Sequence, residues 1–173
     1  IHQFASPLPI QVVFRLIGIP EEDMDRIKDW CGNRVLFIFG KVSPEEQAAS
    51  ARDLVAFWRY ITDFCERRRR EPQDDLTSEL AAIASADESA LTMNEVASVV
   101  MGLGFAGHET TTNMIGSAVM HLLARDGLWA QLAADPALVE NAVEELLRYD
   151  GSVPVWRRVA KVDVELGGVA IPA

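Results

Sequence analysis

The sequence has little positive charge, few cysteines and no long uncharged apolar run. Its 173 residues hold 16 Lys and Arg against 26 Asp and Glu, which gives a net charge of -10. A surface of this sign repels phosphate backbones, so nucleic acid is not an expected partner. The one basic block, residues 67–70, is too short to change this; it is interpreted as a solvated helix end or, alternatively, a small docking patch.

The two cysteines, Cys31 and Cys65, form neither a disulfide framework nor a CxxC pair. A reducing, cytoplasmic location is therefore expected. No run of about eighteen apolar residues is free of charges and helix breakers, so no membrane span is predicted. The chain begins at Ile1 rather than Met and ends at Ala173 within a β pattern, so we expect a piece of a larger protein.

The hydrophobic pattern predicts a mainly α-helical chain with a small sheet at its C-terminal end. Capping boxes at Ser43–Glu46 and Thr92–Glu95 are typical of helix starts. Together with apolar residues at helical spacing, they predict helices over residues 23–39, 44–69, 76–84, 92–126 and 135–147. Beyond Gly151, apolar and polar residues alternate on both sides of Gly167–Gly168, which predicts a β-hairpin.

The helix predicted over 92–126 breaks several local rules within residues 101–112. No proline interrupts it, so it would be about 50 Å long. It nevertheless contains four glycines, each of which costs about 1 kcal/mol relative to Ala, and three consecutive threonines. Rules broken together in one place indicate a functional site. The alternative is a buried helix whose small residues serve close packing.

The residues on one face of this helix indicate the kind of site. That face carries Leu103, Ala106, Gly107, Thr110 and Met114. Small residues there would let a large flat ligand lie against the backbone, and a glycine followed by hydroxyls can kink the helix. Thr110 beside Glu109 supplies the hydroxyl and carboxylate of a short proton relay. An HExxH metal site is excluded because Thr112 stands where a second His is needed, and His121 is interpreted as a core or boundary residue.

Three motifs, in this order along the chain, carry a resemblance to a known family. The stretch Ala106-Gly107-His108-Glu109-Thr110-Thr111 resembles the oxygen-activation motif of the cytochrome P-450 family. Glu145-Leu146-Leu147-Arg148 is similar to the family's ExxR, an i, i+3 carboxylate–guanidinium pair. The spacing alone is weak, since Glu66 and Arg69 also match it; that copy is interpreted as surface.

The third motif is the stretch 156–160 that leads into Asp163. It is similar to the strand that supplies an arginine to a haem propionate in the same family, and Arg158 is the match, with Arg157 as the less favoured neighbour. Guanidinium meets a propionate carboxylate in fork geometry. A solvated pair of arginines at a strand start is the alternative.

The resemblance covers nearly the whole chain and implies a fold. Residues 1–173 would be a single partial domain, the central part of a P-450 catalytic domain of the bacterial soluble type, with a long central helix, lid helices, the ExxR helix and the start of a small β-sheet. The resemblance places the N-terminal part and the cysteine loop that ligates iron outside this sequence. Neither Cys31 nor Cys65 lies in a glycine- and Phe-rich ligand loop, so no metal ligand is assigned here.

The resemblance also implies a function for the parent protein: a haem-dependent monooxygenase that oxidises a hydrophobic substrate with dioxygen and two electrons. The electron donor would be of the ferredoxin or flavodoxin type, fused or separate, and the chain alone is not expected to be active. Thr110 would hydrogen-bond the oxygen and Glu109 would link the relay to solvent, while Glu145 and Arg148 would form a structural ion pair. The expected haem contacts are Ala106, Gly107, Thr110 and Arg158. Position suggests that the substrate meets Leu103, Ala106, Val153, Pro154 and Val155, under a mobile lid around residues 30–39.

Two alternatives compete with this interpretation. A member of the same family could perform an oxygen-independent rearrangement or a peroxide-driven oxidation; the intact Glu109–Thr110 pair argues against it, because such enzymes need no proton relay of this kind. A non-enzymatic helical ligand-binding or regulatory domain would need neither Glu109 nor Arg158. The ordered co-occurrence of the motifs argues against that second alternative.

Overall fold

The structure is a computed structural model that describes residues 2–155 and 158–173, without the side chains of residues 33, 35–37 and 39. In chain order its longer elements are α1 (Pro7–Leu16), α2 (Met24–Phe39), α3 (Pro44–Arg70), α4 (Leu76–Ala86), α5 (Met93–Ala106), α6 (Glu109–Leu123), α7 (Leu128–Ala134), α8 (Val139–Tyr149), β1 (Val164–Leu166) and β2 (Val169–Ile171). Single 3-10 turns precede α2 (Glu21–Asp23) and α8 (Pro136–Leu138). The fold is mainly α with a small sheet, as predicted.

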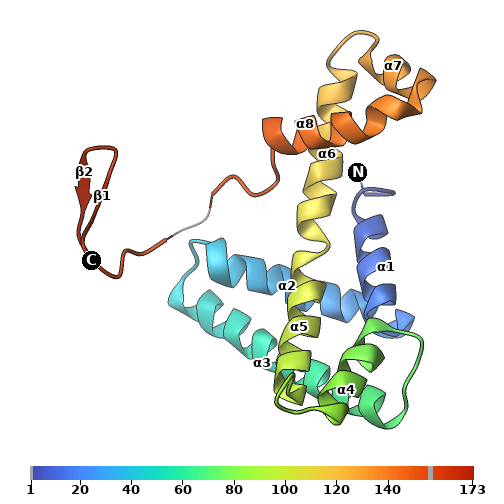
Figure 1. Ribbon diagram of the computed structural model, residues 1–173, viewed down its shortest axis with the longest axis vertical. Helices are drawn as coiled ribbons and strands as arrows, with labels where there is room; N and C mark the ends of the chain where they lie inside the picture. Colours follow the sequence, from blue (N-terminus) through green and yellow to red (C-terminus); the bar gives the residue numbers. More distant parts are fainter. Residues whose placement is uncertain (1, 156–157) are drawn as a thin grey trace.

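Helices α5 and α6 run end to end and form the spine of the molecule (Figure 1). Helices α1 to α4 surround α5, while α7 and α8 pack at the far end of α6. An extended segment leads from α8 to the antiparallel hairpin of β1 and β2, which stands apart from the helices. No helix of the described ranges is both long and apolar enough to cross a membrane.

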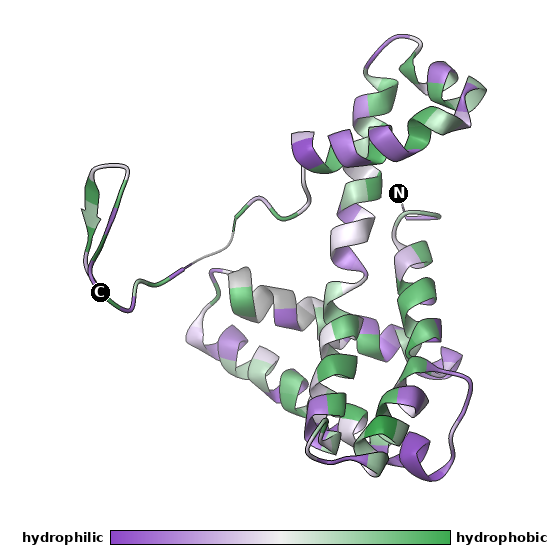
Figure 2. Cartoon of the chain, in the orientation of Figure 1, coloured by the Kyte–Doolittle hydropathy of each residue, from purple (hydrophilic) through white to green (hydrophobic). Residues whose placement is uncertain are grey.

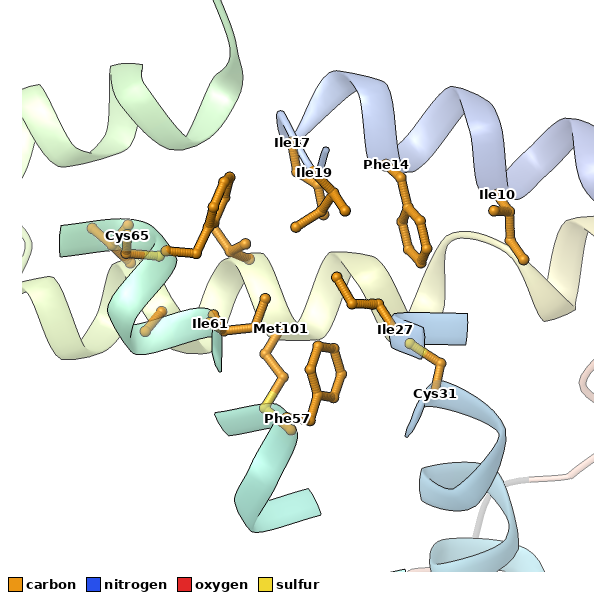
Figure 3. Packing of buried hydrophobic residues seen from close by; sticks show 14 of the residues in the cluster. Ile10, Phe14, Ile17, Ile19, Ile27, Cys31, Phe57, Ile61, Cys65 and Met101 are labelled. Atoms are coloured by element: carbon orange, nitrogen blue, oxygen red, sulfur yellow. The ribbon is translucent and has the colours of Figure 1, made fainter. Parts of the chain in front are cut away.

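The hydrophobic core lies where α1, α2, α3 and α5 meet (Figure 3). Phe14, Ile27, Phe57 and Val100, one from each helix, have no exposed surface at all. Burying a side chain of this size stabilises the fold by about 1.5–3 kcal/mol. Gly104 of α5 faces this core: a Cβ there would lie 3.7 Å from Phe14 and 3.8 Å from Phe57, which is ordinary van der Waals contact.

Both predicted capping boxes form. The Ser43 hydroxyl accepts from the Glu46 N–H at 3.2 Å, and the Glu46 carboxylate accepts from the Ser43 N–H at 2.8 Å. Thr92 and Glu95 repeat the arrangement at the start of α5, at 3.2 and 2.8 Å. These reciprocal bonds satisfy backbone donors that a helix start leaves unpaired, which explains why the sequence located both starts correctly.

The helix predicted over 92–126 is not continuous, and a short helix beyond it was not predicted. The regular helix is interrupted at Gly107–His108, although both residues keep φ and ψ in the right-handed helical region, and α6 begins at Glu109. The Thr110 hydroxyl donates to the Ala106 carbonyl at 2.9 Å, so a side chain occupies a carbonyl at the end of α5. The unpredicted helix is α7, which follows Gly127 in the left-handed region at φ +75°.

A buried ion pair fixes the turn between α1 and α2 against the turn between α3 and α4. The Arg68 Nε donates to the Asp75 carboxylate at 2.6 Å, and its Nη2 donates to the Gly18 carbonyl at 2.8 Å. Asp75 also caps α4 by accepting from the Ser78 N–H at 2.8 Å. Gly18 has φ +79°, and a Cβ on it would collide with the Asp75 carboxylate. We call Arg68, Asp75 and Gly18 the Arg68 clamp.

Two further arginines of the basic block also make contacts within the chain. The Arg67 guanidinium lies 5.8 Å from the Phe64 ring centroid, and Arg69 pairs with Glu66 at 2.8 Å. These contacts favour the helix-end interpretation over a docking patch. The loop that follows, residues 71–75, is the hydrophilic stretch between α3 and α4 (Figure 2).

Strands β1 and β2 form the predicted hairpin, with Glu165 opposite Ala170 in the middle of the register. The Ala173 N–H donates to the Asp163 carboxylate at 2.9 Å and closes its open end. Every residue of both strands is exposed, including Leu166 at 71% and Val169 at 63%.

Candidate functional site

The break between α5 and α6 carries an open, flat strip on one helix face. Gly102, Ala106 and Thr110 follow one another at i, i+4 and i+8, so they line up along the spine. A Cβ on Gly102 would meet no atom within 4 Å, and Ala106 is exposed. Because no bulky side chain rises from this strip, a large planar group can lie directly on the backbone. The strip therefore fits the flat cofactor that the sequence motifs imply.

Gly107 lies on a different face of the spine, where it contacts α1. A Cβ on Gly107 would lie 2.6 Å from Val13 Cγ2 of α1, so this glycine permits close contact between α1 and the spine. Leu103 packs against the hydrophobic core rather than standing free on the strip. The glycine-rich stretch therefore combines the two interpretations: Gly107 serves packing, whereas Gly102 and Ala106 leave the strip open. Haem contact by Gly107 and substrate contact by Leu103 stay predictions.

Alanine replacements of two glycines will separate these roles. Gly107→Ala is expected to lower the free energy of unfolding by about 1–3 kcal/mol, because the new methyl overpacks against Val13. Gly102→Ala, in the same helix but facing open space, should be neutral or stabilising by up to about 1 kcal/mol. Urea unfolding measures both, and adding Val13→Ala to Gly107→Ala should restore most of the loss. Equal effects at the two glycines would contradict the assignment.

Glu109 and Thr110 begin α6 directly after the break. Both are half-buried, and the Thr110 hydroxyl donates its hydrogen to the Ala106 carbonyl. Its oxygen retains lone pairs, so the hydroxyl can also accept a hydrogen bond from a second group. The next hydroxyl, that of Thr111, bonds the Gly107 carbonyl at the longer distance of 3.4 Å. The geometry suits a relay, while the catalytic roles of Glu109 and Thr110 stay predictions.

His108 lies on the opposite side of the break from the strip. It is buried, its Nδ1 lies 3.3 Å from the Gly104 carbonyl, and its ring stands edge-on to Phe14 at 6.5 Å. Burial lowers the pKa of His108, which favours the neutral ring in this environment. Within the described residues no cluster of three or more His, Cys, Asp or Glu could hold a metal ion. The His108 ring therefore packs against the break between α5 and α6.

The two thiols are buried in helices of the core. Burial raises the pKa of Cys31 to about 12, against the opposing influence of Arg34 and with a further contribution from Glu109. Burial likewise raises the pKa of Cys65 to about 12. The thiolate is the form that ligates metals, so these surroundings disfavour metal binding by either cysteine.

Glu145 and Arg148 form the predicted ion pair on α8. The Arg148 Nε and Nη2 donate to the two oxygens of the Glu145 carboxylate at 2.7 and 2.6 Å, a bidentate arrangement. The hydrogen bonds from Arg148 hold the pKa of Glu145 below its usual range. Both side chains are more than half exposed, so their contribution to stability in this chain is small.

The remaining predicted contacts lie in the segment that follows α8. Val153 and Val155 are 40% and 67% exposed, and Figure 1 shows the segment leading away from α5. The structure therefore does not bring Val153, Pro154 and Val155 to Leu103 and Ala106, and their substrate contacts stay predictions. Arg158 is exposed on the same segment, whereas Arg157 lies outside the described residues.

A group of polar contacts between α6 and α8 was missed by the sequence reasoning. His121, interpreted as a core or boundary residue, pairs with Asp150 at 2.8 Å. His121 also lines a cleft of about 310 Å³ between α6, α7 and α8. No sequence pattern links residues this far apart, so only the folded chain reveals the contact.

No family model matches the chain, but individual proteins do. It is 37% identical to the vitamin D(3) 25-hydroxylase of Pseudonocardia autotrophica, over 99% of this chain and 41% of that protein. It is 39% identical to the nocardicin C N-oxygenase of Nocardia uniformis subsp. tsuyamanensis, over 98% of this chain and 41% of that protein. The chain therefore spans about two-fifths of the length of these relatives.

Solved structures give the same match in three dimensions. The cytochrome P450 CREJ, in complex with (4-ethylphenyl) dihydrogen phosphate, aligns with a TM-score of 0.91 at 36% identity, over 99% of this chain and 42% of that one. P450BioI, in complex with an acyl carrier protein ligated to hexadec-9Z-enoic acid, aligns with a TM-score of 0.87 at 34% identity, over 98% and 43%.

Proposed function

We propose that this chain, whose sequence and fold are similar to those of bacterial cytochrome P450s, is the central segment of such a protein and acts as part of a haem-dependent monooxygenase. The whole protein would oxidise a hydrophobic organic substrate with dioxygen and two electrons. The observation that carries the proposal is the open strip of Gly102, Ala106 and Thr110 beside a hydroxyl-stabilised helix break. The matched relatives are named as hydroxylases and an oxygenase, which supports the reaction class.

The chain's own residues would hold the cofactor on the strip. The haem, ligated through its iron by a thiolate from outside this chain, would supply the activation of dioxygen. Gly102 and Ala106 would give it a flat surface, and Arg158 would pair with a propionate. The Glu145–Arg148 pair would orient neighbouring segments of the same protein through its remaining hydrogen-bonding capacity.

Proton delivery would depend on Glu109 and Thr110. The helix break lets the Thr110 hydroxyl bond a carbonyl of α5 while its oxygen accepts a second hydrogen bond. Glu109, half-buried at the first turn of α6, would exchange protons with solvent and pass them to this hydroxyl. Such a relay admits protons singly while the apolar surroundings exclude bulk water.

The substrate and the partners belong to the same proposal. An apolar substrate would contact Ala106 and Leu103 from the spine and Val153 to Val155 from the loop, once the rest of the protein holds that loop over the strip. The electron donor would be of the ferredoxin or flavodoxin type, fused or separate, in a reducing cytoplasmic compartment.

The first experiment is the absorption spectrum of the reduced, carbon-monoxide-bound full-length protein. We expect the red-shifted Soret band of thiolate-ligated haem. A well-folded full-length protein without any haem spectrum would contradict the proposal. It would mean that the glycine-rich stretch serves only helix packing. A haem spectrum without the red shift would contradict the thiolate ligand.

A further inference from the structure

A compact set of polar and aromatic contacts joins the last turn of α6 to the last turn of α8. His121 Nε2 lies 2.8 Å from Asp150 Oδ2, and the His121 side chain is only 19% exposed. Hydrogen bonds from His121 and Ser117, both on α6, hold the pKa of Asp150 below its usual range. A neutral imidazole donates one N–H, so this contact does not require a protonated ring.

Aromatic contacts hold the same pair from a second side. The Tyr149 ring stands edge-on to His121, with centroids 5.0 Å apart and an interplanar angle of 87°. The Arg125 guanidinium lies 5.4 Å from the Tyr149 centroid, and its Nη1 donates to the His121 carbonyl at 3.2 Å. We call His121, Tyr149 and Asp150 the α6–α8 latch.

The position of the latch in the chain indicates what it controls. Asp150 is the residue at which α8 ends, and its φ of -145° turns the chain out of the helix. Gly151 follows, where a Cβ would lie 3.0 Å from the Leu147 carbonyl, so the exit is tight. The chain then continues to Val153 and Arg158. The latch therefore fixes the point from which this segment leaves.

The latch lies too far along the spine to take part in the chemistry itself. His121 is eleven residues after Thr110 on the same helix, a distance of about 17 Å at 1.5 Å per residue. It would act through α8 and the segment after it. Glu145 and Arg148 lie within two turns of Asp150 on α8, so the latch also sets how their pair is presented to the rest of the protein.

We propose that His121 and Asp150 are positioning residues, which set where residues 151–155 leave α8 relative to the helix that begins with Glu109 and Thr110. The role of that segment toward substrate and haem rests on the proposed function. The latch itself rests on the geometry of α6 and α8 alone. An experiment can therefore contradict the role of the segment without contradicting the latch, and the reverse.

Hydrogen exchange of the backbone amides in the last turn of α8, which include the Asp150 N–H that donates to the Leu146 carbonyl at 3.0 Å, is the direct test in the full-length protein. His121→Leu removes the donor, and exchange there should become about tenfold faster while amides of α3 are unchanged. His121→Gln places an amide N–H near the position of Nε2 and should restore slow exchange. Glu144→Gln removes one charge from an exposed position of α8 and should change nothing. Unchanged exchange in His121→Leu, or faster exchange throughout the molecule, would overturn the proposal.

Two additions keep the result decisive. Where His121→Leu does not fold, Ser117→Ala removes one of the two donors to Asp150 and should give a smaller local increase in exchange rate at the same amides. No increase would count against the latch.

The rate of haem transfer to apomyoglobin, measured on the same variants, should rise about threefold or more in His121→Leu and return to the original rate in His121→Gln. Faster exchange without faster haem transfer would retain the latch and overturn its effect on Arg158; absence of haem in every protein would overturn the proposed function alone.

Discussion

Replacing Arg68 with Met is expected to lower the free energy of unfolding of the full-length protein by about 3 kcal/mol. The change leaves the Asp75 carboxylate, whose side chain is only 3% exposed, without its cation. Removing one partner of a buried pair costs about 3–5 kcal/mol, because the remaining charge is neither solvated nor paired. We take the low end, since Arg68 retains 20% exposure. Urea unfolding measures the loss.

The neighbouring arginine supplies a matched control for this prediction. Arg69 pairs with Glu66 at the surface, with side-chain exposures of 46% and 31%, so Arg69→Met should cost under about 1 kcal/mol. Adding Asp75→Asn to Arg68→Met should recover part of the loss, because Asn removes the unpaired charge and still caps α4. Equal losses at Arg68 and Arg69 would show that the Arg68 clamp does not act as a buried pair.

Replacing Thr110 with Ala is expected to separate electron consumption from product formation in the full-length enzyme. Without the hydroxyl, the proton path loses the hydrogen-bonding group that Thr110 contributes, and product formed per electron pair should fall by about 10²-fold. Electrons should still be consumed and appear as hydrogen peroxide. Parallel assays of reductant consumed, product formed and peroxide released measure the effect.

The threonine run contains the control for this second prediction. Thr110→Ser keeps a hydroxyl and should retain most of the product yield, while Thr111→Ala removes only the weaker bond to the Gly107 carbonyl. Unchanged coupling in Thr110→Ala, or an equal loss in Thr111→Ala, would contradict the assignment of Thr110 to the relay.

Local sequence patterns were enough to locate most of the fold. The capping boxes at Ser43 and Thr92 depend on bonds between residues three apart, so their spacing alone specifies the helix starts. The hairpin likewise follows from alternation around Gly167–Gly168. The break at Gly107 was anticipated as a kink, but the sequence did not show that the helix would stop there.

In the candidate site too, the sequence located the residues that lie close together in the chain but not the contacts between distant residues. Glu109 and Thr110 are adjacent in the chain, and Glu145 and Arg148 are one turn apart, so their spacing indicated both motifs. The contact of Gly107 with Val13 and the pairing of His121 with Asp150 join distant parts of the sequence. Such contacts depend on how helices pack, which no local pattern specifies, so the contact of Gly107 with α1 became visible only in the folded chain.

The hairpin has a consequence for handling the chain by itself. Its two strands expose Leu166, Val169 and the backbone donors and acceptors of both outer edges. A two-stranded ribbon is marginal in water, and open strand edges with apolar side chains recruit further strands. In a preparation of this chain alone, the hairpin is therefore the place where intermolecular β-pairing would begin. Aggregates would then be rich in β-structure even though the protein itself is mostly helix.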